Sequence, residues 1–260
     1  MKKNLFFAFV FSLIFILVGC QEEVTTTNES KPVVINDDAE APSITIDVIN
    51  KLQNDWLLKI NATNFTFTPG EAGTKEQSYN EGYAQLYVDG KAVNRLYGDY
   101  YNLGSLEAGS HKIKVTLNAH NGGELSKDGH VIEAVATVSV NDDKTGMHMH
   151  KPTIVTSEQP PTISVSADDQ GANNWVVKLD TTNFEFMPEK VNSHIVSQNE
   201  GHAHIYVDGV KINRVYGTYY YLGHLEKGSH EIKVTLNAND HGELMLDGKP
   251  IQGTTTIEVK

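Results

Sequence analysis

The chain has 260 residues and a formal net charge of −12, from 21 Lys and Arg against 33 Asp and Glu. Phosphate binding needs a basic surface, so this acidic composition argues against a nucleic-acid partner. Cys20 is the only cysteine, which excludes a disulfide within the chain and a zinc site built from cysteines. Any metal ion must therefore be held by His, Met or carboxylate side chains.

The first 19 residues have the pattern of an export signal. A basic start precedes an apolar run from Leu5 to Val18, shorter than the about 20 residues of a membrane-spanning helix. Residues 17–20 read Leu-Val-Gly-Cys and resemble a bacterial lipobox, which implies a lipoprotein signal peptide over 1–19 and lipidation of Cys20. The lipid would anchor the protein to a bacterial membrane, extracytoplasmically, at the cell surface or in the periplasm. The alternative is a plain signal peptide with an incidental cysteine.

Residues 20–42 hold the lipidated cysteine and a stretch rich in Thr, Glu, Asn, Asp and Ser. This stretch has only a few scattered Val and Ile, too little apolar surface to fold alone. It predicts a flexible tether.

The rest of the sequence consists of two similar copies of one domain. Trp56 corresponds to Trp175 and Arg95 to Arg214, both at an offset of 119 residues. A period this long indicates duplication of a whole domain, because solenoid repeats run roughly 20–50 residues. The copies are expected at 43–140 and 162–260, joined by a linker over 141–161.

Each copy has the pattern of an all-β domain. Short segments alternate apolar with polar residues, and turn signals such as Asp208-Gly209 separate them. No segment predicts a convincing amphipathic helix. These patterns favour two tandem immunoglobulin-like β-sandwich domains. Strands are expected at 43–48, 56–60, 65–67, 162–166, 175–179, 184–186, 203–207, 231–236 and 254–259.

The two copies differ most clearly in their histidines. Five histidines occur only in the second copy, where the first has Lys, Tyr, Gln, Ser and Gly: His194, His202, His204, His224 and His241. His202 and His204 lie two residues apart on an expected strand, so their side chains share one face with Cα atoms about 6.6 Å apart. Two such imidazoles can converge on one ion. Ala203 and Ile205 belong to the apolar set of this strand, so the histidines are expected to point outward, and solvated surface histidines are the alternative.

Two further histidines strengthen the metal hypothesis. His241 comes just after a strand end, where a loop can carry a ligand back over the sheet, and His194 precedes the strand of His202. The expected ligand set is His202, His204, His241 and His194, with His224 and Met187 as weaker candidates. Asp240 could accept a hydrogen bond from a ligand imidazole and so orient it.

The linker carries a separate candidate site. Residues 147–150 read Met-His-Met-His, and thioether sulfur favours Cu(I) while imidazole suits copper, zinc and nickel. Met147, His148, Met149 and His150 could collect copper for the second copy, or they could be a short flexible run without a role.

Other recurrent residues point to structure instead. His111 and His230 occur at equivalent positions in both copies, so a hydrogen-bonded structural role is expected for each. The tyrosine-rich segments 95–101 and 214–221 also recur. They indicate packing, or a shared surface that binds a glycan, the cell wall or a protein.

The segments 199–209, 214–217 and 236–241, with Gly-His-Ala-His and Asn-Asp-His, resemble a largely uncharacterised family of secreted bacterial His-rich β-domains. The resemblance covers most of 162–259, and 43–140 in degenerate form, because Tyr83, Gln85 and Gly122 interrupt the pattern. It implies metal binding at His194, His202, His204 and His241, with copper as the expected ion and zinc as the alternative.

A looser similarity to copper–zinc superoxide dismutase rests on the His-x-His of a strand. That family also needs a disulfide, a bridging histidine and zinc-loop ligands, none of which can be identified here, so superoxide chemistry is not expected.

The leading expectation is a lipid-anchored metal-binding lipoprotein for copper storage, delivery or resistance, which passes its ion to a protein partner and is not an enzyme. The first copy would be a spacer or a dimerisation unit. The alternatives are an interaction module that uses the tyrosine surfaces, and a redox metalloenzyme. The sequence has no Ser-His-Asp arrangement and no nucleotide fingerprint.

Overall fold

The computed structural model describes residues 31–36, 39–52, 54–70, 78–141, 151–193 and 196–260. Within these residues the regular elements are β-strands and one short 3-10 helix, η1 (Pro188–Lys190). No helix in this part of the chain is long and apolar enough to cross a membrane. The all-β class predicted from the alternating segments is confirmed.

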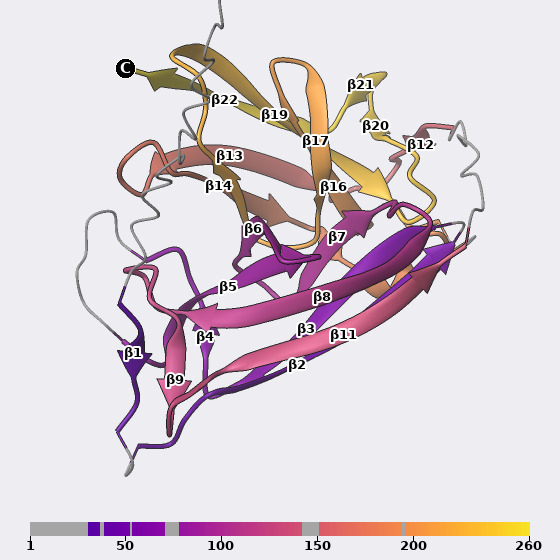
Figure 1. Ribbon diagram of the computed structural model, residues 1–260. Helices are drawn as coiled ribbons and strands as arrows, with labels where there is room; N and C mark the ends of the chain where they lie inside the picture. Colours follow the sequence, from indigo (N-terminus) through magenta and orange to yellow (C-terminus); the bar gives the residue numbers. More distant parts are fainter. Residues whose placement is uncertain (1–30, 37–38, 53, 71–77, 142–150, 194–195) are drawn as a thin grey trace, which may run out of the picture.

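The first unit, residues 43–140, is built from two facing sheets (Figure 1). The smaller sheet has the strand order β2-β3-β7, and the larger has β11-β8-β5-β4, with β6 also paired to β5. Its strands are β2 (Ser43–Leu52), β3 (Asp55–Thr63), β4 (Thr66–Phe67), β5 (Glu81–Val88), β6 (Lys91–Leu96), β7 (Tyr100–Gly104), β8 (Gly109–Asn118), β9 (Leu125–Lys127), β10 (His130–Val131) and β11 (Glu133–Val140).

The second unit, residues 162–260, repeats this arrangement. One sheet has the order β13-β14-β18, and the other has β15-β16-β19-β22, with β17 also paired to β16. Its strands are β13 (Thr162–Asp169), β14 (Trp175–Thr182), β15 (Glu185–Phe186), β16 (Glu200–Val207), β17 (Val210–Val215), β18 (Tyr219–Gly223), β19 (Gly228–Ala238), β20 (Leu244–Leu246), β21 (Lys249–Pro250) and β22 (Gln252–Val259).

The order of the seven main strands identifies the fold of each unit. The first, second and fifth strands along the chain form one sheet, and the third, fourth, sixth and seventh form the other. An immunoglobulin-like sandwich divides its strands in this way, here with the fourth strand on the larger sheet. Each unit is therefore an immunoglobulin-like β-sandwich, as predicted.

The core of each sandwich comes from alternate residues of the facing strands. In the second unit, Ala203 and Ile205 of β16 are fully buried with Val234 and Leu236 of β19. Side chains alternate between the two faces of a strand, so the residues between them must point to the opposite face. The parity predicted for His202 and His204 is confirmed by this packing.

Short strands outside the two predicted domains complete a small sheet in each unit. β1 (Val33–Val34) pairs in parallel with β9, and β12 (Thr153–Ile154) pairs in parallel with β20. Ile35 and Val155, which follow these strands, are buried in the cores of the first and second unit. The flexible tether predicted over 20–42 is therefore wrong for residues 33–35, and the linker over 141–161 is wrong for 153–155. The composition of these segments did not predict that Ile35 and Val155 would be buried at the edges of the two cores.

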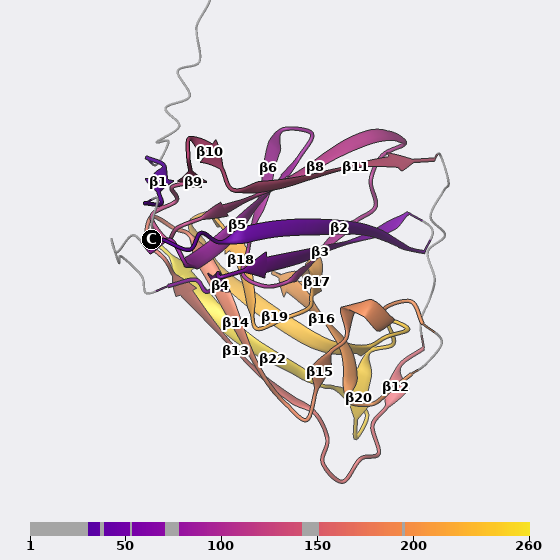
Figure 2. The ribbon, with the colours of Figure 1, turned by 90° about the horizontal axis from the view of Figure 1, so that it is seen from below.

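The two units contact each other through equivalent elements. β7 of the first unit contacts β17 of the second, and β6 contacts β18, so the contacts are related by an approximate twofold symmetry (Figures 1 and 2). Two small apolar clusters lie between the units. One combines Leu57 with Val191 and Tyr216, and the other combines Tyr83 and Tyr97 with Val176.

Candidate metal centre

Three histidines of the second unit converge on one point. Nε2 of His202 lies 3.0 Å from Nε2 of His204 and 3.2 Å from Nδ1 of His241. One ligand nitrogen from each of the three rings lies within 4.8 Å of the others. His202, His204 and His241 are the part of the expected ligand set that the structure brings together.

Strand β16 sets the positions of His202 and His204. In its antiparallel pairing with β19, His202 lies opposite Asn237 and His204 opposite Thr235. Gly201 allows this close pairing, because a Cβ atom there would lie 1.9 Å from the carbonyl oxygen of Asn237. Gly82 has the same close approach in the first unit. The scaffold for the two histidines is thus common to both units, and only the side chains differ.

The face that carries these histidines is not open to solvent, which corrects the prediction of an outward, accessible pair. His202 is 0% exposed and His204 is 7% exposed. The parity was right, but this face is covered by Tyr216, by His241 and by the segment around Asn192. A large part of the cover comes from residues distant in sequence, so strand alternation could not reveal it.

His241 reaches the cluster from the tight turn that follows β19. The turn is closed by hydrogen bonds from the His241 N–H to the Ala238 carbonyl and from the Ala238 N–H to the Gly242 carbonyl. His241 has a φ of 70°, in the left-handed region that favours glycine, and the equivalent Gly122 has a φ of 88°. Asn237 donates to the His241 carbonyl, so the residue opposite His202 also holds the turn of the third ligand.

Asn192 orients the ring of His241, and sequence reasoning missed it. Asn192 Nδ2 donates to Asp55 Oδ2 of the first unit at 3.0 Å, so Oδ1 of the same amide faces Nε2 of His241. This network assigns the hydrogen of neutral His241 to Nε2 and directs the Nδ1 lone pair at the cluster. The available signal was the comparison of the repeats, since the first copy has Gly73 where the second has Asn192.

Lys211 of β17 contacts the cluster from the other side. Its Nζ lies 3.0 Å from Nε2 of His204. Burial, and then the charge of Arg214, lower the pKa of Lys211 to about 8. An ammonium group only donates, so Nε2 of His204 accepts and its lone pair is directed at Lys211. A metal ion at this nitrogen would replace the lysine hydrogen bond.

The environment keeps His202 neutral. Burial lowers its pKa well below the usual range, and the neighbouring imidazoles of His204 and His241 lower it further. Nδ1 of His202 has no hydrogen-bond partner among the described residues. The ring is held by packing instead, with centroids 4.8 Å from His204, 4.8 Å from His241 and 6.0 Å from Tyr216. Neutral imidazole is the form that binds a metal ion.

Two of the three nitrogen separations fit a metal ion, and the third lies within 4.8 Å. Metal–nitrogen bonds of about 2.0–2.1 Å in a tetrahedron put neighbouring ligand nitrogens about 3.3 Å apart. The two shortest nitrogen separations, 3.0 and 3.2 Å, are close to that edge length. Three protein ligands leave a fourth position for water, another side chain or a partner's ligand. The donors are all imidazole nitrogens, which suit copper, zinc and nickel.

Other candidate ligands have different outcomes. His224 is exposed and is not part of the described histidine cluster, which corrects its inclusion. Met187 donates its backbone N–H to the Gly201 carbonyl, one residue before His202, and remains a candidate. Asp240 accepts from the Gly242 N–H through its carboxylate and so helps to close the turn, and it makes no hydrogen bond to an imidazole of the described cluster. The remaining predicted residues lie outside the described part of the chain: Cys20, Met147, His148, Met149, His150 and His194.

The shared histidines are structural, as predicted. Nδ1 of His230 lies 2.7 Å from Asp208 Oδ2, and its Nε2 lies 2.8 Å from the Glu226 carbonyl oxygen. His111 makes the same two contacts with Asp89 and Glu107. Each histidine therefore ties a strand to a neighbouring hairpin turn.

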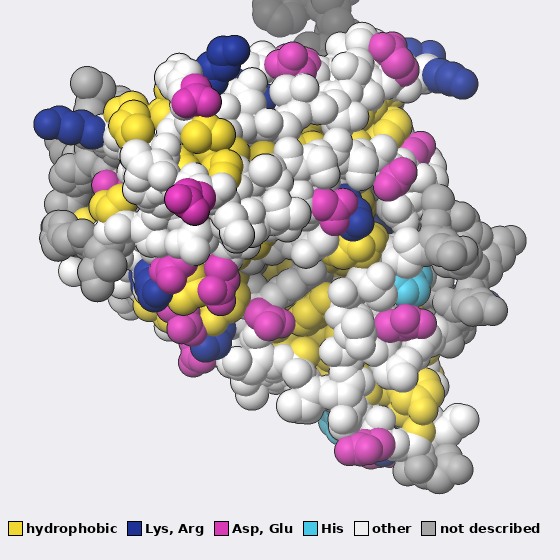
Figure 3. All heavy atoms as spheres, turned by 180° about the vertical axis from the view of Figure 1, so that it is seen from behind, with side chains coloured by type: hydrophobic (Ala, Val, Ile, Leu, Met, Phe, Trp, Pro, Cys, Tyr) yellow, Lys and Arg dark blue, Asp and Glu magenta, His cyan; other side chains and the backbone are white. Residues whose placement is uncertain are grey.

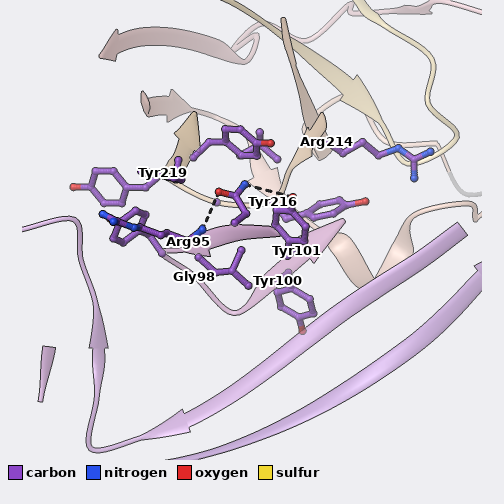
Figure 4. Close-up of a pocket in the computed structure, with 14 residues that line it drawn as sticks. Arg95, Gly98, Tyr100, Tyr101, Arg214, Tyr216 and Tyr219 are labelled. Carbon is purple, nitrogen blue, oxygen red and sulfur yellow. Dashed lines mark hydrogen bonds between the residues drawn. The ribbon is translucent and has the colours of Figure 1, made fainter. Parts of the chain in front are cut away.

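The recurrent tyrosines lie largely between the two units. Tyr97 and Tyr216 are each 9% exposed and Tyr220 is 8% exposed, which corrects the expectation of an exposed aromatic strip at these positions. Tyrosines and the two equivalent arginines line a cavity of about 30 Å³, large enough to hold water. Figure 4 shows Arg95 and Arg214 at opposite ends of this cavity.

Figure 3 shows one outer face, with acidic side chains spread over it and little histidine exposed.

The first unit fills the equivalent place differently. Tyr83 replaces His202, and the Arg95 guanidinium stacks on its ring at 4.8 Å from the centroid. Arg95 also stacks on Tyr221 of the second unit, at 4.9 Å. An aromatic–cation stack thus occupies the position in the first unit that corresponds to the histidine cluster.

Comparison with profiles of known protein families gives no match, and comparison with curated proteins gives none. Among solved structures, the chain is similar to fibronectin(III)-like modules of Clostridium thermocellum CbhA, with 13% identity over 83% of this chain and 94% of that chain. The TM-score of that match is 0.25. The fold class therefore rests on the strand order of the two sandwiches, and the candidate site rests on its own geometry.

Proposed function

We propose that this protein is a lipid-anchored, extracytoplasmic metal-binding lipoprotein that holds one copper ion in its second unit. The convergence of His202, His204 and His241 carries the proposal, because one nitrogen of each ring lies within 4.8 Å of the others and Asn192 directs the Nδ1 lone pair of His241 at the cluster. The protein would store copper, deliver it or protect the cell from it, as a binding protein and not as an enzyme.

One feature of the chain, its pair of linker thioethers, supports copper over zinc. All donors of the cluster are imidazole nitrogens, which bind both metals. The same chain also carries two thioethers in Met147-His148-Met149-His150, and soft sulfur ligands select Cu(I). We propose that this run collects copper and passes it to the histidine cluster, and that a protein partner takes the ion from there.

The proposed location rests on the first twenty residues. The basic start, the apolar run and the lipobox ending in Cys20 support export and lipid anchoring. An anchored body of this kind would meet metal ions outside the cytoplasm.

The test is the stoichiometry and affinity of Cu(I), Cu(II) and Zn(II) binding to the soluble chain, residues 21–260, with competing chelators of known affinity. One copper ion per chain, bound more tightly than zinc, is the expected result. The double variant His202→Ala/His204→Ala should lose this ion. The matched control, His130→Ala/His224→Ala, removes two exposed histidines and should keep it.

Other outcomes would redirect or reject the proposal. An ion that survives the His202→Ala/His204→Ala change and is lost with the Met-His run would place the site in the linker. Tighter binding of zinc would change the metal. No binding above that of the double variant would reject the metal function.

A further inference from the structure

The histidine cluster is covered by a segment that we call the strap, residues Met187–Ser193, which includes η1. The backbone N–H of Asn192 donates to the Asn239 carbonyl at 2.9 Å, which holds the strap against the turn that carries His241. Lys190 forms an ion pair with Glu200 at the start of β16. The strap therefore lies directly against the strand and the turn that supply the metal ligands.

The strap is fixed on its other side by the first unit. Glu189 accepts from Lys59 Nζ at 2.8 Å and from the Tyr100 hydroxyl at 2.6 Å, and its backbone carbonyl accepts from Lys51. Val191 is buried against Leu57 in the small cluster between the units. Polar and apolar contacts of the first unit together hold the segment that covers the site.

One carboxylate of the first unit connects this interface to a metal ligand. Asp55 Oδ2 accepts from Asn192 Nδ2 at 3.0 Å and from Arg214 Nη1 at 2.6 Å. The donor side of the Asn192 amide is thereby turned to Asp55, and its oxygen is turned to Nε2 of His241. Asp55, Asn192 and His241 form a relay from the first unit to the ligand nitrogen.

We propose that the first unit is a clamp for the metal centre, in which Asp55 and Asn192 are positioning residues for His241. This inference rests on the proposed metal function. It replaces the role of spacer or dimerisation unit expected for the first copy. The site is then completed only when the two units are docked, and metal binding in turn stabilises the docked arrangement.

The repeat shows that this relay belongs to one side of the interface only. The residue equivalent to Asp55 is Asn174, and its Oδ1 accepts from the Tyr221 hydroxyl within the second unit. The equivalent of Arg214 is Arg95, which stacks on Tyr221 across the interface and reaches no histidine of the cluster. Arg95→Met is therefore a matched control, because it removes the equivalent arginine contact at the other end of the interface and leaves the strap untouched.

The experiment measures copper affinity and the Co(II) absorption spectrum of the soluble chain, residues 21–260, in four variants. Asp55→Ala and Asn192→Gly should each weaken copper binding about 10- to 100-fold, the usual effect of losing an outer-shell partner. Glycine is chosen because Asn192 has a φ of 65°. Both variants should also change the Co(II) ligand-field bands, which report the ligand geometry. Asp55→Asn should restore affinity, because one amide oxygen can accept both bonds that Oδ2 accepts.

Amide hydrogen exchange of the metal-free protein tests the clamp without metal. Asp55→Ala should accelerate exchange at the Asn192 amide, and Arg95→Met should leave it and the copper affinity unchanged. Added copper should slow exchange at the strap of the parent chain.

Each contrary result has a defined meaning. If Asp55→Ala and Asn192→Gly keep the parent affinity and spectrum, the clamp is rejected while the metal function stands. If Asp55→Ala weakens binding and Asn192→Gly does not, the effect runs through the charge of Arg214 and the relay is rejected. If Arg95→Met weakens copper binding as much as Asp55→Ala does, the whole interface affects the site and the specific role of the strap is rejected. If the parent chain binds no metal, the proposed function and the clamp fail together.

Discussion

His241 both contributes a nitrogen to the histidine cluster and adopts a left-handed backbone conformation in a tight turn. The first unit has Gly122 in the same turn, with the same hydrogen bond from the preceding strand: Asn118 donates to the Gly122 carbonyl as Asn237 does to that of His241. The turn therefore accepts glycine without rearrangement. Histidine at this position is compatible with a ligand role and is not needed to form the turn.

His241→Gly should separate metal binding from stability. We expect the copper affinity to fall by more than the about 10- to 100-fold cost of losing an outer-shell partner, because a ligand itself is removed. The free energy of unfolding of the metal-free protein should change by no more than about 1 kcal/mol, since glycine relieves the left-handed conformation but loses more backbone entropy. Chelator competition and urea unfolding measure the two quantities. Equal copper affinity in the variant would remove His241 from the ligand set.

Residue-level prediction from the sequence succeeded where the signal is local. The side-chain parity of β16 and the comparison of the two copies were sufficient to select His202, His204 and His241. Burial of these side chains was not predictable, because the cover comes from the strap and from Tyr216. Asn192 and Asp55 differ between the copies, but their role in positioning His241 depends on contacts between the units. No local sequence pattern predicts those contacts.

At the scale of single elements, β1 is a strand that is too short to be predicted from the sequence. Val34 is 69% exposed, while Ile35 is 2% exposed in the first core. Only two residues make the strand, so there is no alternation long enough to recognise. The long strands, in contrast, were predictable because each buries one face over six residues or more.

Ile35→Ala should destabilise the first unit by about 2–5 kcal/mol, because it leaves a cavity in a packed core. Val34→Ala is the control and should change the free energy of unfolding by less than about 0.5 kcal/mol, as is usual for exposed positions. Urea unfolding of both variants gives these values. Similar small effects of both substitutions would mean that residues 33–35 add nothing to the stability of the sandwich.

The two His–Asp pairs on β8 and β19 predict a pH-dependent stability. The hydrogen bond that His230 donates to Asp208, and then the one to the Glu226 carbonyl, raise the pKa of His230, while the bond from His230, and then that from the Glu231 N–H, lower the pKa of Asp208. The same directions hold for His111 and Asp89. A raised histidine pKa gives stability that is complete below the unfolded value of about 6.5 and is lost as the pH rises through the folded pKa. A lowered Asp pKa gives stability that is present above about 3.9 and is lost as the pH falls.

The contribution of the two pairs should therefore be largest between about pH 4 and 6.5. We expect the difference in melting temperature between the parent chain and His111→Gln/His230→Gln to be greatest in that window and to shrink towards pH 8. Taking the difference removes the contribution of other groups, including the buried His202. Melting curves from pH 3 to 9 with a chelator present measure it. A difference that is constant across this range would mean that neither histidine titrates differently in the folded protein.

At the scale of the whole molecule, the duplicated domain has become asymmetric around its own interface. One end of the interface holds Arg214, Asp55 and the strap beside the histidines, and the other end holds Arg95 between Tyr83 and Tyr221. The number of domains and their sandwich fold could be read from one sequence, because the repeat and the strand alternation are explicit. The docking of the two units could not, since the tyrosines that form it look the same in an exposed strip and in a buried contact.

The two tryptophans allow this docking to be followed in solution. Trp56 lies in the first unit and Trp175 at the equivalent position of the second, and each donates to a neighbouring asparagine at 2.7 Å. Trp175→Phe leaves a fluorescent reporter only in the first unit, and Trp56→Phe leaves one only in the second. Copper at 100 times its dissociation constant should stabilise the second unit by about 2.7 kcal/mol.

If docking transmits this stabilisation, the urea midpoint reported by Trp56 should rise with copper together with that of Trp175, although the proposed site lies in the second unit. With Asp55→Ala added, and copper again at 100 times the dissociation constant of that variant, the shift at Trp56 should become smaller than the shift at Trp175. If copper does not change the urea midpoint reported by Trp56 in the parent chain, the two units unfold independently. The contacts of Glu189 and Asn192 with the first unit would then hold the strap in place without making the two sandwiches one cooperative body.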